Sequence, residues 1–124
     1  MTSAESTSKR DLSIGVSDSE AGTVVCLSGR VSVDSSPALR EQLLELLKRP
    51  SPTALTIDMA DLAYLDFSGI ATLIEALRTA RRRNTKLQLR GLHDGPRHLL
   101  EVAGLLPLFD TDDQKNDPFP SEVQ

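Results

Sequence analysis

The sequence has few aromatic residues, one cysteine and no long apolar run, and each shortage excludes a class of protein. Aromatic side chains make up 3% of the 124 residues, so a hydrophobic core must be built from leucine, isoleucine, valine and alanine. The single cysteine, Cys26, excludes an internal disulfide, and its apolar neighbours predict a buried thiol. No apolar run approaches the length of a membrane span, and the first residues lack the apolar core of a secretory signal. We therefore expect a cytoplasmic protein with no direct membrane insertion.

The length and charge describe one acidic domain. With 39% hydrophobic and 26% charged residues, the chain has the composition of a globular protein. Its 124 residues are enough to form a hydrophobic core. A net charge of -4 argues against a nucleic-acid partner. Residues 1–10 are rich in serine and threonine and are predicted to be disordered, and residues 112–124 are predicted to form an acidic flexible tail. The predicted folded domain therefore covers residues 11–111.

Apolar residues recur with two different periods between these ends. A period of two, typical of strands, is found at residues 12–16, 54–59 and 86–91, and residues 23–29 form a more fully apolar strand pattern that ends at Gly29. Helical periods begin at Ser36, after Gly69 and near Pro96, and residues 106–109 are a candidate edge strand. Strands joined through helices are normally parallel, whereas the first two are joined by a short polar turn that favours a hairpin. The predicted fold class is α/β, with a mixed four- to five-stranded sheet and helices packed mainly on one face.

The stretch LAYLDFSGIATL, residues 62–73, predicts a strand that turns directly into a helix. Short polar residues at such a corner cap the first amides of the helix, and the same amides attract anions. Asp66, Ser68 and Gly69 therefore fit a structural cap, a phosphate site or a docking loop. Phe67, in a chain with few aromatics, either tucks under the helix or stands out as an anchor for a partner.

Three stretches, over residues 24–47, 54–89 and 96–109, follow the order and spacing of a known family. The combination of LAYLDFSGI entering a helix with a later LLEVAGL helix is specific. In these motifs the chain resembles the STAS domain family, and within it the stand-alone bacterial anti-sigma factor antagonists. The resemblance implies a STAS fold and a non-enzymatic regulator of sigma-factor-dependent transcription, acting in a partner-switching pathway. The implied partner is a serine kinase/anti-sigma factor of the ATPase-like kinase family, and we expect a monomer or weak dimer.

The resemblance also implies which residues form the binding surface. In this family the kinase phosphorylates a serine or threonine directly after the aspartate, and that position is Phe67 here. Ser68 matches a second serine of many members and is the phospho-acceptor candidate, while Ser32 occupies a position that is often acidic. The implied partner-binding residues are Ser32, Val33, Ser36, Asp66, Phe67, Ser68, Gly69 and Thr72.

Some STAS domains are instead accessory subunits that dock on the ATPase of a membrane transport complex. A phenylalanine after the aspartate suits such a constitutive scaffold better than it suits a phosphorylation switch. This is the alternative function. A subunit of a larger sensory assembly is a third possibility, but such proteins usually carry a further sensory domain.

The remaining charged and histidine motifs give weaker indications of function. The arginines from Arg78 to Arg83 are predicted in the last turns of a helix, where cations suit the dipole, or as a patch for an acidic partner. His93 and Asp94 follow a strand and are candidates for the rim of the corner at Asp66. His93 and His98 lack cysteine or carboxylate companions at metal-ligand spacing, and no glycine-rich phosphate loop follows a strand. We expect no metal and no cofactor.

Overall fold

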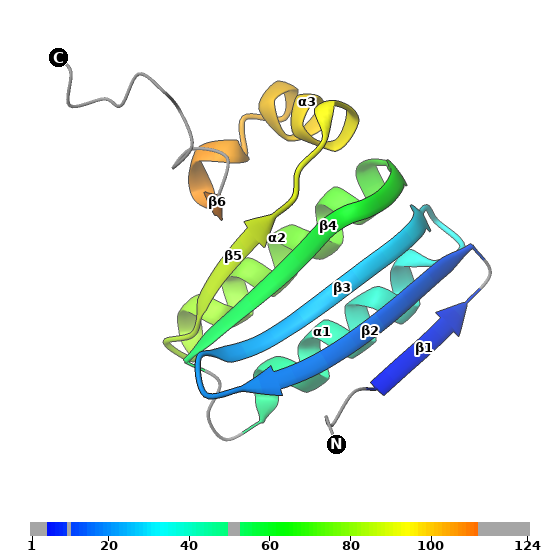
Figure 1. The fold of residues 1–124 in the computed structure, drawn as a ribbon. Coiled ribbons are helices and arrows are strands. Elements are labelled where there is room, and N and C mark those ends of the chain that lie inside the picture. Colours follow the sequence, from blue (N-terminus) through cyan, green and yellow to red (C-terminus); the bar gives the residue numbers. More distant parts are fainter. Residues whose placement is uncertain (1–4, 10, 50–52, 112–124) are drawn as a thin grey trace, which may run out of the picture.

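The computed structural model describes residues 5–9, 11–49 and 53–111, which form one mixed sheet with helices (Figure 1). The six strands lie in sequence order: β1 (Glu5–Lys9), β2 (Leu12–Ser19), β3 (Gly22–Val31), β4 (Ala54–Leu65), β5 (Lys86–Arg90) and β6 (Asp110–Thr111). The helices are α1 (Ser36–Lys48), α2 (Phe67–Arg82), α3 (Asp94–Val102) and the short 3₁₀ helix η1 (Leu106–Leu108). The predicted α/β class is confirmed.

The connections between strands explain the mixed pairing. β2 and β3 pair antiparallel through a tight turn, whereas β3, β4 and β5 pair parallel because α1 and α2 carry the chain back across the sheet. In Figure 1 both of these helices lie behind the sheet, and α3 lies beyond the ends of β4 and β5. As predicted, the long helices therefore cover one face.

The hydrophobic core lies between that face and the two helices. Alternate strand residues point into it, including Leu55, Ile57 and Met59 of β4. α1 buries leucines at positions 39, 43, 46 and 47 against the sheet, and α2 buries Leu73 among others. The helical and strand periods predicted from the sequence thus mark the residues that the core buries.

Cys26 differs from its prediction, because it is exposed. Its neighbours Val25 and Leu27 are buried on the helix side, so Cys26 points to the uncovered face of β3. Apolar neighbours indicate burial only where both faces of a sheet are covered. Partial burial and the nearby Asp58 carboxylate raise the pKa of the thiol.

The edges of the sheet also differ from the prediction. Residues 5–9, within the segment predicted to be disordered, form β1 and pair antiparallel with β2. Residues 106–108 form η1 instead of a strand, with Pro107 in its first turn, and the last strand is the two-residue β6. Two short edge strands thus extend the expected four- to five-stranded sheet to six. The predicted tail, residues 112–124, lies outside the described residues.

Candidate functional site

The predicted corner lies where β3 and β4 end side by side. Val31 pairs with Leu65, and the amide of Asp66 donates to the carbonyl of Val31 at 3.2 Å. Residues that follow these two strands, among them Val33 and Phe67, therefore emerge at the same edge of the sheet. This is the edge at which open parallel sheets present their functional groups.

Irregular pairing shapes the last part of β4. Its register against β3 shifts twice, between Cys26 and Ser28 and again between Gly29 and Arg30. Beyond Met59 the buried positions are therefore Leu62 and Leu65, three residues apart instead of two. Bulges of this kind redirect side chains, and here Tyr64 is left exposed next to the corner.

Asp66 caps α2. Its Oδ1 accepts hydrogen bonds from the amide of Ser68 at 2.9 Å and from the amide of Gly69 at 3.3 Å. The hydroxyl of Ser68 donates to the same oxygen. The structural cap is therefore present, and the one hydroxyl between Asp66 and Gly69 is engaged with the capping carboxylate.

We expect Asp66→Ala to lower the free energy of unfolding by about 0.5–2 kcal/mol, the usual cost of losing a helix cap. Asp66→Asn keeps an oxygen that can accept the same amide hydrogen bonds, and should retain most of the stability. Urea unfolding followed by circular dichroism measures both. Equal losses in the two variants would show that charge, and not the cap geometry, stabilises this helix start.

Gly69 allows the first turn of α2 to approach the strand ends. A Cβ at this position would lie 2.3 Å from Cδ1 of Leu65 and 2.8 Å from Cγ1 of Val31. Larger residues would push the helix away from β3 and β4. The glycine therefore has a packing role, consistent with the tight helix entry that the sequence predicts.

Phe67 does not tuck under the helix. Its exposed fraction is 64%, and that of Val33, at the end of β3, is 70%. Large exposed apolar side chains are few among the residues that the structure describes, and these two follow paired strand ends. The structure thus presents a permanently apolar patch at the corner.

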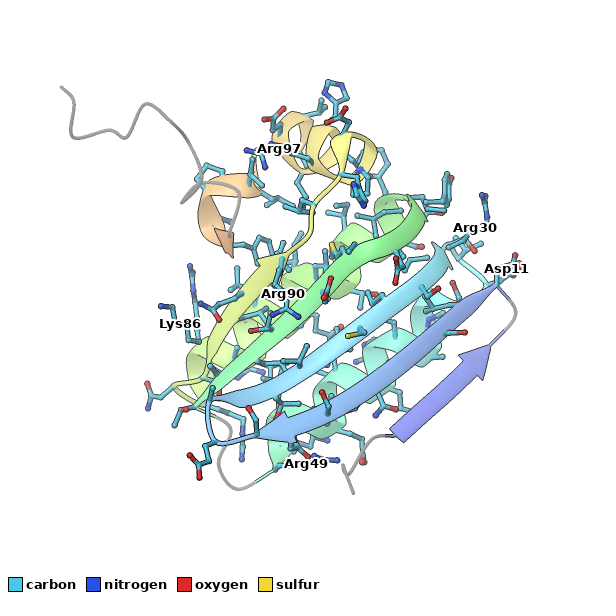
Figure 2. The ribbon with its side chains drawn as sticks, viewed as in Figure 1. Asp11, Arg30, Arg49, Lys86, Arg90 and Arg97 are labelled. Atoms are coloured by element: carbon cyan, nitrogen blue, oxygen red, sulfur yellow. The ribbon has the colours of Figure 1, made fainter. Side chains whose placement is uncertain are left out.

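Two further residues, which sequence reasoning missed, flank this patch. The guanidinium carbon of Arg30 lies 4.1 Å from the centre of the Tyr64 ring, and Arg30 sits at the end of β3 in Figure 2. Such stacking orders both side chains. The available signal was the single tyrosine of the chain, placed two residues before Asp66.

The loop before α1 is held by its own serines. The Ser35 hydroxyl donates to the Arg30 carbonyl at 2.9 Å and accepts from the Ser32 amide at 3.0 Å. The Ser32 hydroxyl accepts from the amide of Asp34 at 3.3 Å. These hydrogen bonds order the backbone on both sides of Val33.

The structure brings the eight predicted partner-binding residues to one end of the molecule, but with different accessibility. Val33 and Phe67 are exposed, whereas Ser32, Asp66 and Ser68 are half-buried. Three are buried and serve the local packing, namely Ser36, Gly69 and Thr72. The most exposed of the eight residues are therefore the two apolar ones, while the half-buried Asp66 accepts hydrogen bonds from backbone amides and from the Ser68 hydroxyl.

The uncovered face of the sheet carries an ion pair between neighbouring strands. A guanidinium nitrogen of Arg90 lies 2.9 Å from Oδ2 of Asp58, and Figure 2 shows Arg90 across β4 and β5. Partial burial acts to raise the pKa of Asp58. The amide of Ala60 and the guanidinium of Arg90 outweigh this effect and hold the pKa below its ordinary value of 3.8.

This lowered pKa predicts a pH dependence of stability. The ionised Asp58 stabilises the fold above about pH 4, and its contribution is lost as the pH falls through the lowered pKa of the folded state. The wild-type midpoint of urea unfolding should fall more steeply between about pH 5 and 3 than that of Asp58→Asn. Parallel profiles for the two proteins would contradict a stabilising role for this ion pair.

The remaining candidates come from the start of α3 and from the end of α2. His93 contacts the carbonyl of Ala60 in β4 through Nε2, and Asp94 begins α3. Their place on the rim of the corner at Asp66 stays a prediction. Arg81 and Arg82 lie in the last turn of α2, as predicted. Within residues 5–9, 11–49 and 53–111, no group of three or more histidines, cysteines and carboxylates could hold a metal ion. No helix in the same ranges is long and apolar enough to span a membrane.

Comparisons with known proteins agree with the fold. The family model STAS_2, described as "Mlab, STAS domain", matches residues 14–108. An anti-sigma-B factor antagonist of Bacillus subtilis is 25% identical over 81% of this chain and 90% of its own length. Its counterpart from Listeria monocytogenes is 27% identical over 69% of this chain and 75% of its own. The solved structure of an anti-sigma factor antagonist from Mycobacterium paratuberculosis shares the fold, with a TM-score of 0.75 at 21% identity over 85% of this chain and 88% of that one.

Proposed function

Because this chain belongs to the STAS domain family, we propose that it is an anti-sigma factor antagonist. In this proposal it binds a serine kinase/anti-sigma factor of the ATPase-like kinase family in the cytoplasm and thereby frees a sigma factor. It acts by association and not by catalysis. Two relatives named anti-sigma-B factor antagonists, similar over most of their length, support this choice.

The observation that carries the proposal is the exposed apolar corner. Phe67 and Val33 stand on a rigid base, because Asp66 caps α2 and Ser35 ties the preceding loop to β3. A preorganised anchor of this kind binds without the entropic cost of ordering a loop. The docking surface comprises Val33 and Phe67, with the half-buried Ser32, Asp66 and Ser68 between them.

Ser68 is the proposed phospho-acceptor of this surface, since Phe67 has no hydroxyl. Its hydroxyl already donates to Asp66, so a phosphate would place about two negative charges beside the capping carboxylate. Incubation with the cognate kinase and ATP, followed by mass spectrometry, tests this assignment. Phosphate on another residue would contradict it.

Isothermal titration calorimetry against the anti-sigma factors encoded in the source genome tests the function itself. We expect a complex with one of them, and release of its sigma factor when the antagonist is added to the preformed sigma complex. Failure of every such anti-sigma factor to bind would overturn the proposal.

Phe67 favours one second candidate, an accessory subunit of a membrane transport complex. A side chain without a hydroxyl offers the same apolar contact at all times, which suits a permanent subunit. Stable co-purification with a transport ATPase, in place of an anti-sigma factor, would support this candidate. Transporter genes beside the coding sequence would favour the same choice.

A further inference from the structure

The exposed side of α2 continues the apolar corner toward the other end of the helix. Five residues spaced by three or four positions form what we name the α2 stripe: Phe67, Ala71, Ile74, Arg78 and Arg82. This spacing places them along one helix face, opposite the buried face that contains Leu73. Ala71 and Arg78 are exposed, and Ile74 is half-buried. The stripe is apolar at its start and basic at its end.

A groove of about 400 Å³ follows the stripe, lined by Ala71, Ile74, Glu75, Arg78, Thr79 and Arg82. Glu75 is the one carboxylate among these lining residues, and Arg40 of α1 neutralises it through two hydrogen bonds of 2.7 and 2.8 Å. These bonds hold the pKa of Glu75 below its ordinary value. The charge that the groove offers to a ligand is therefore positive, within a protein of net charge -4.

The helix dipole accounts for only part of this pattern. Arg82 lies in the last turn of α2, where a cation stabilises the helix, and it donates to the hydroxyl of Thr79 at 3.3 Å. Arg78 lies before that turn, and Ile74 one turn earlier still, where the dipole has little effect. An apolar residue followed by a cation along an open groove fits a ligand that has an apolar group followed by an anionic group.

We propose that the α2 stripe binds an acidic amphipathic protein segment supplied by the partner. Apolar side chains of that segment would contact Phe67, Ala71 and Ile74, and its carboxylates would pair with Arg78 and Arg82. At about 1.5 Å per residue, the stripe spans about 22 Å, the length of a short helix. The inference rests on the proposed function for the partner's identity, and it specifies that partner's chemistry.

A peptide titration tests the chemistry without the natural partner. The probe is a helical peptide of about fifteen residues, matching the stripe in length, with leucines in its first turns and glutamates in its last turns. The control peptide replaces the glutamates with lysines. In nuclear magnetic resonance spectra of the full chain, we expect the glutamate peptide to shift amides of residues 67–82 more than the control does. Equal responses, or shifts centred outside α2, would overturn the proposal.

Charge reversal in the complex with the anti-sigma factor provides the second arm. We expect Arg78→Glu to weaken binding about tenfold at low salt, because it converts an attraction into a repulsion. Arg81→Glu makes the same change of charge on another side of α2, in a hollow shared with Leu77 and Leu108, and should have little effect. Thermal unfolding of both variants checks that the fold is retained.

The outcomes separate the two proposals. Equal affinities of Arg78→Glu and Arg81→Glu for an anti-sigma factor that binds the wild type would overturn the stripe and leave the function in place. If no anti-sigma factor binds the wild type, the function fails and the peptide titration still decides on the stripe. Amide shifts of residues 112–124 caused by Arg78→Glu in the free chain would assign the groove to the acidic C-terminal segment, and so overturn the partner segment.

Discussion

Leu73→Ala should lower the free energy of unfolding by about 2–4 kcal/mol, and Ile57→Ala should cost a similar amount. Both side chains are fully buried, with exposed fractions of 0%. Leu73 faces the sheet from the middle of α2, and Ile57 faces the helices from β4. Truncation removes apolar contacts and leaves a cavity between the sheet and the helices. The surrounding structure relaxes only partly into such a cavity.

Urea unfolding at equilibrium measures these losses. Val102→Ala is the control, because Val102 has an exposed fraction of 65% on α3, and its truncation should change stability by less than about 0.5 kcal/mol. Losses below about 1 kcal/mol for both core variants would show that α2 does not pack on β4 as described.

The two long helices and the inner strands of the fold could be predicted because they carry periodic patterns of apolar residues. α1 and α2 display apolar residues at helical spacing, and β4 and β5 display them at alternate positions. These patterns arise because each helix or strand buries one face in the core, so the position of the core is visible in the sequence of each element. The crossover rule then gives parallel pairing without further information.

The features that could not be predicted depend on contacts between distant segments. The exposure of Cys26 follows from helices covering one face of β3 only, although its neighbours Val25 and Leu27 are apolar on either side. The exposure of Tyr64 follows from register shifts between β3 and β4. Pairing of β1 with β2 supplies backbone hydrogen bonds to a segment whose composition gives no sign of a strand.

The candidate site shows the same division. The sequence DFSG predicts the cap by Asp66, because a short carboxylate before a helix accepts amide hydrogen bonds locally. It leaves the orientation of Phe67 undecided, because that depends on space beneath the helix. Leu65 and Val31 occupy the space next to Gly69 in the first turn of α2, and the phenylalanine ring is exposed.

Phe67→Ala should weaken binding to the anti-sigma factor by about 1–3 kcal/mol, or about five- to 150-fold. The ring is exposed at the start of α2, at the same edge of the sheet as the exposed Val33, and its burial by a partner would remove a large apolar area from water. Val102→Ala removes a side chain of similar exposure far along the chain and should leave binding unchanged.

Two substitutions at Ser68 separate apolar contact from charge in the same calorimetric experiment. Ser68→Ala removes a hydroxyl that donates to Asp66 within the chain, so it should barely change the affinity. Ser68→Asp places a carboxylate beside that of Asp66 and beneath the apolar patch, so it should impair binding by desolvation and repulsion. If Phe67→Ala binds as tightly as the wild type while Ser68→Asp does not, the affinity of the partner depends on the charge at this corner. The phenylalanine is then not the anchor of the complex.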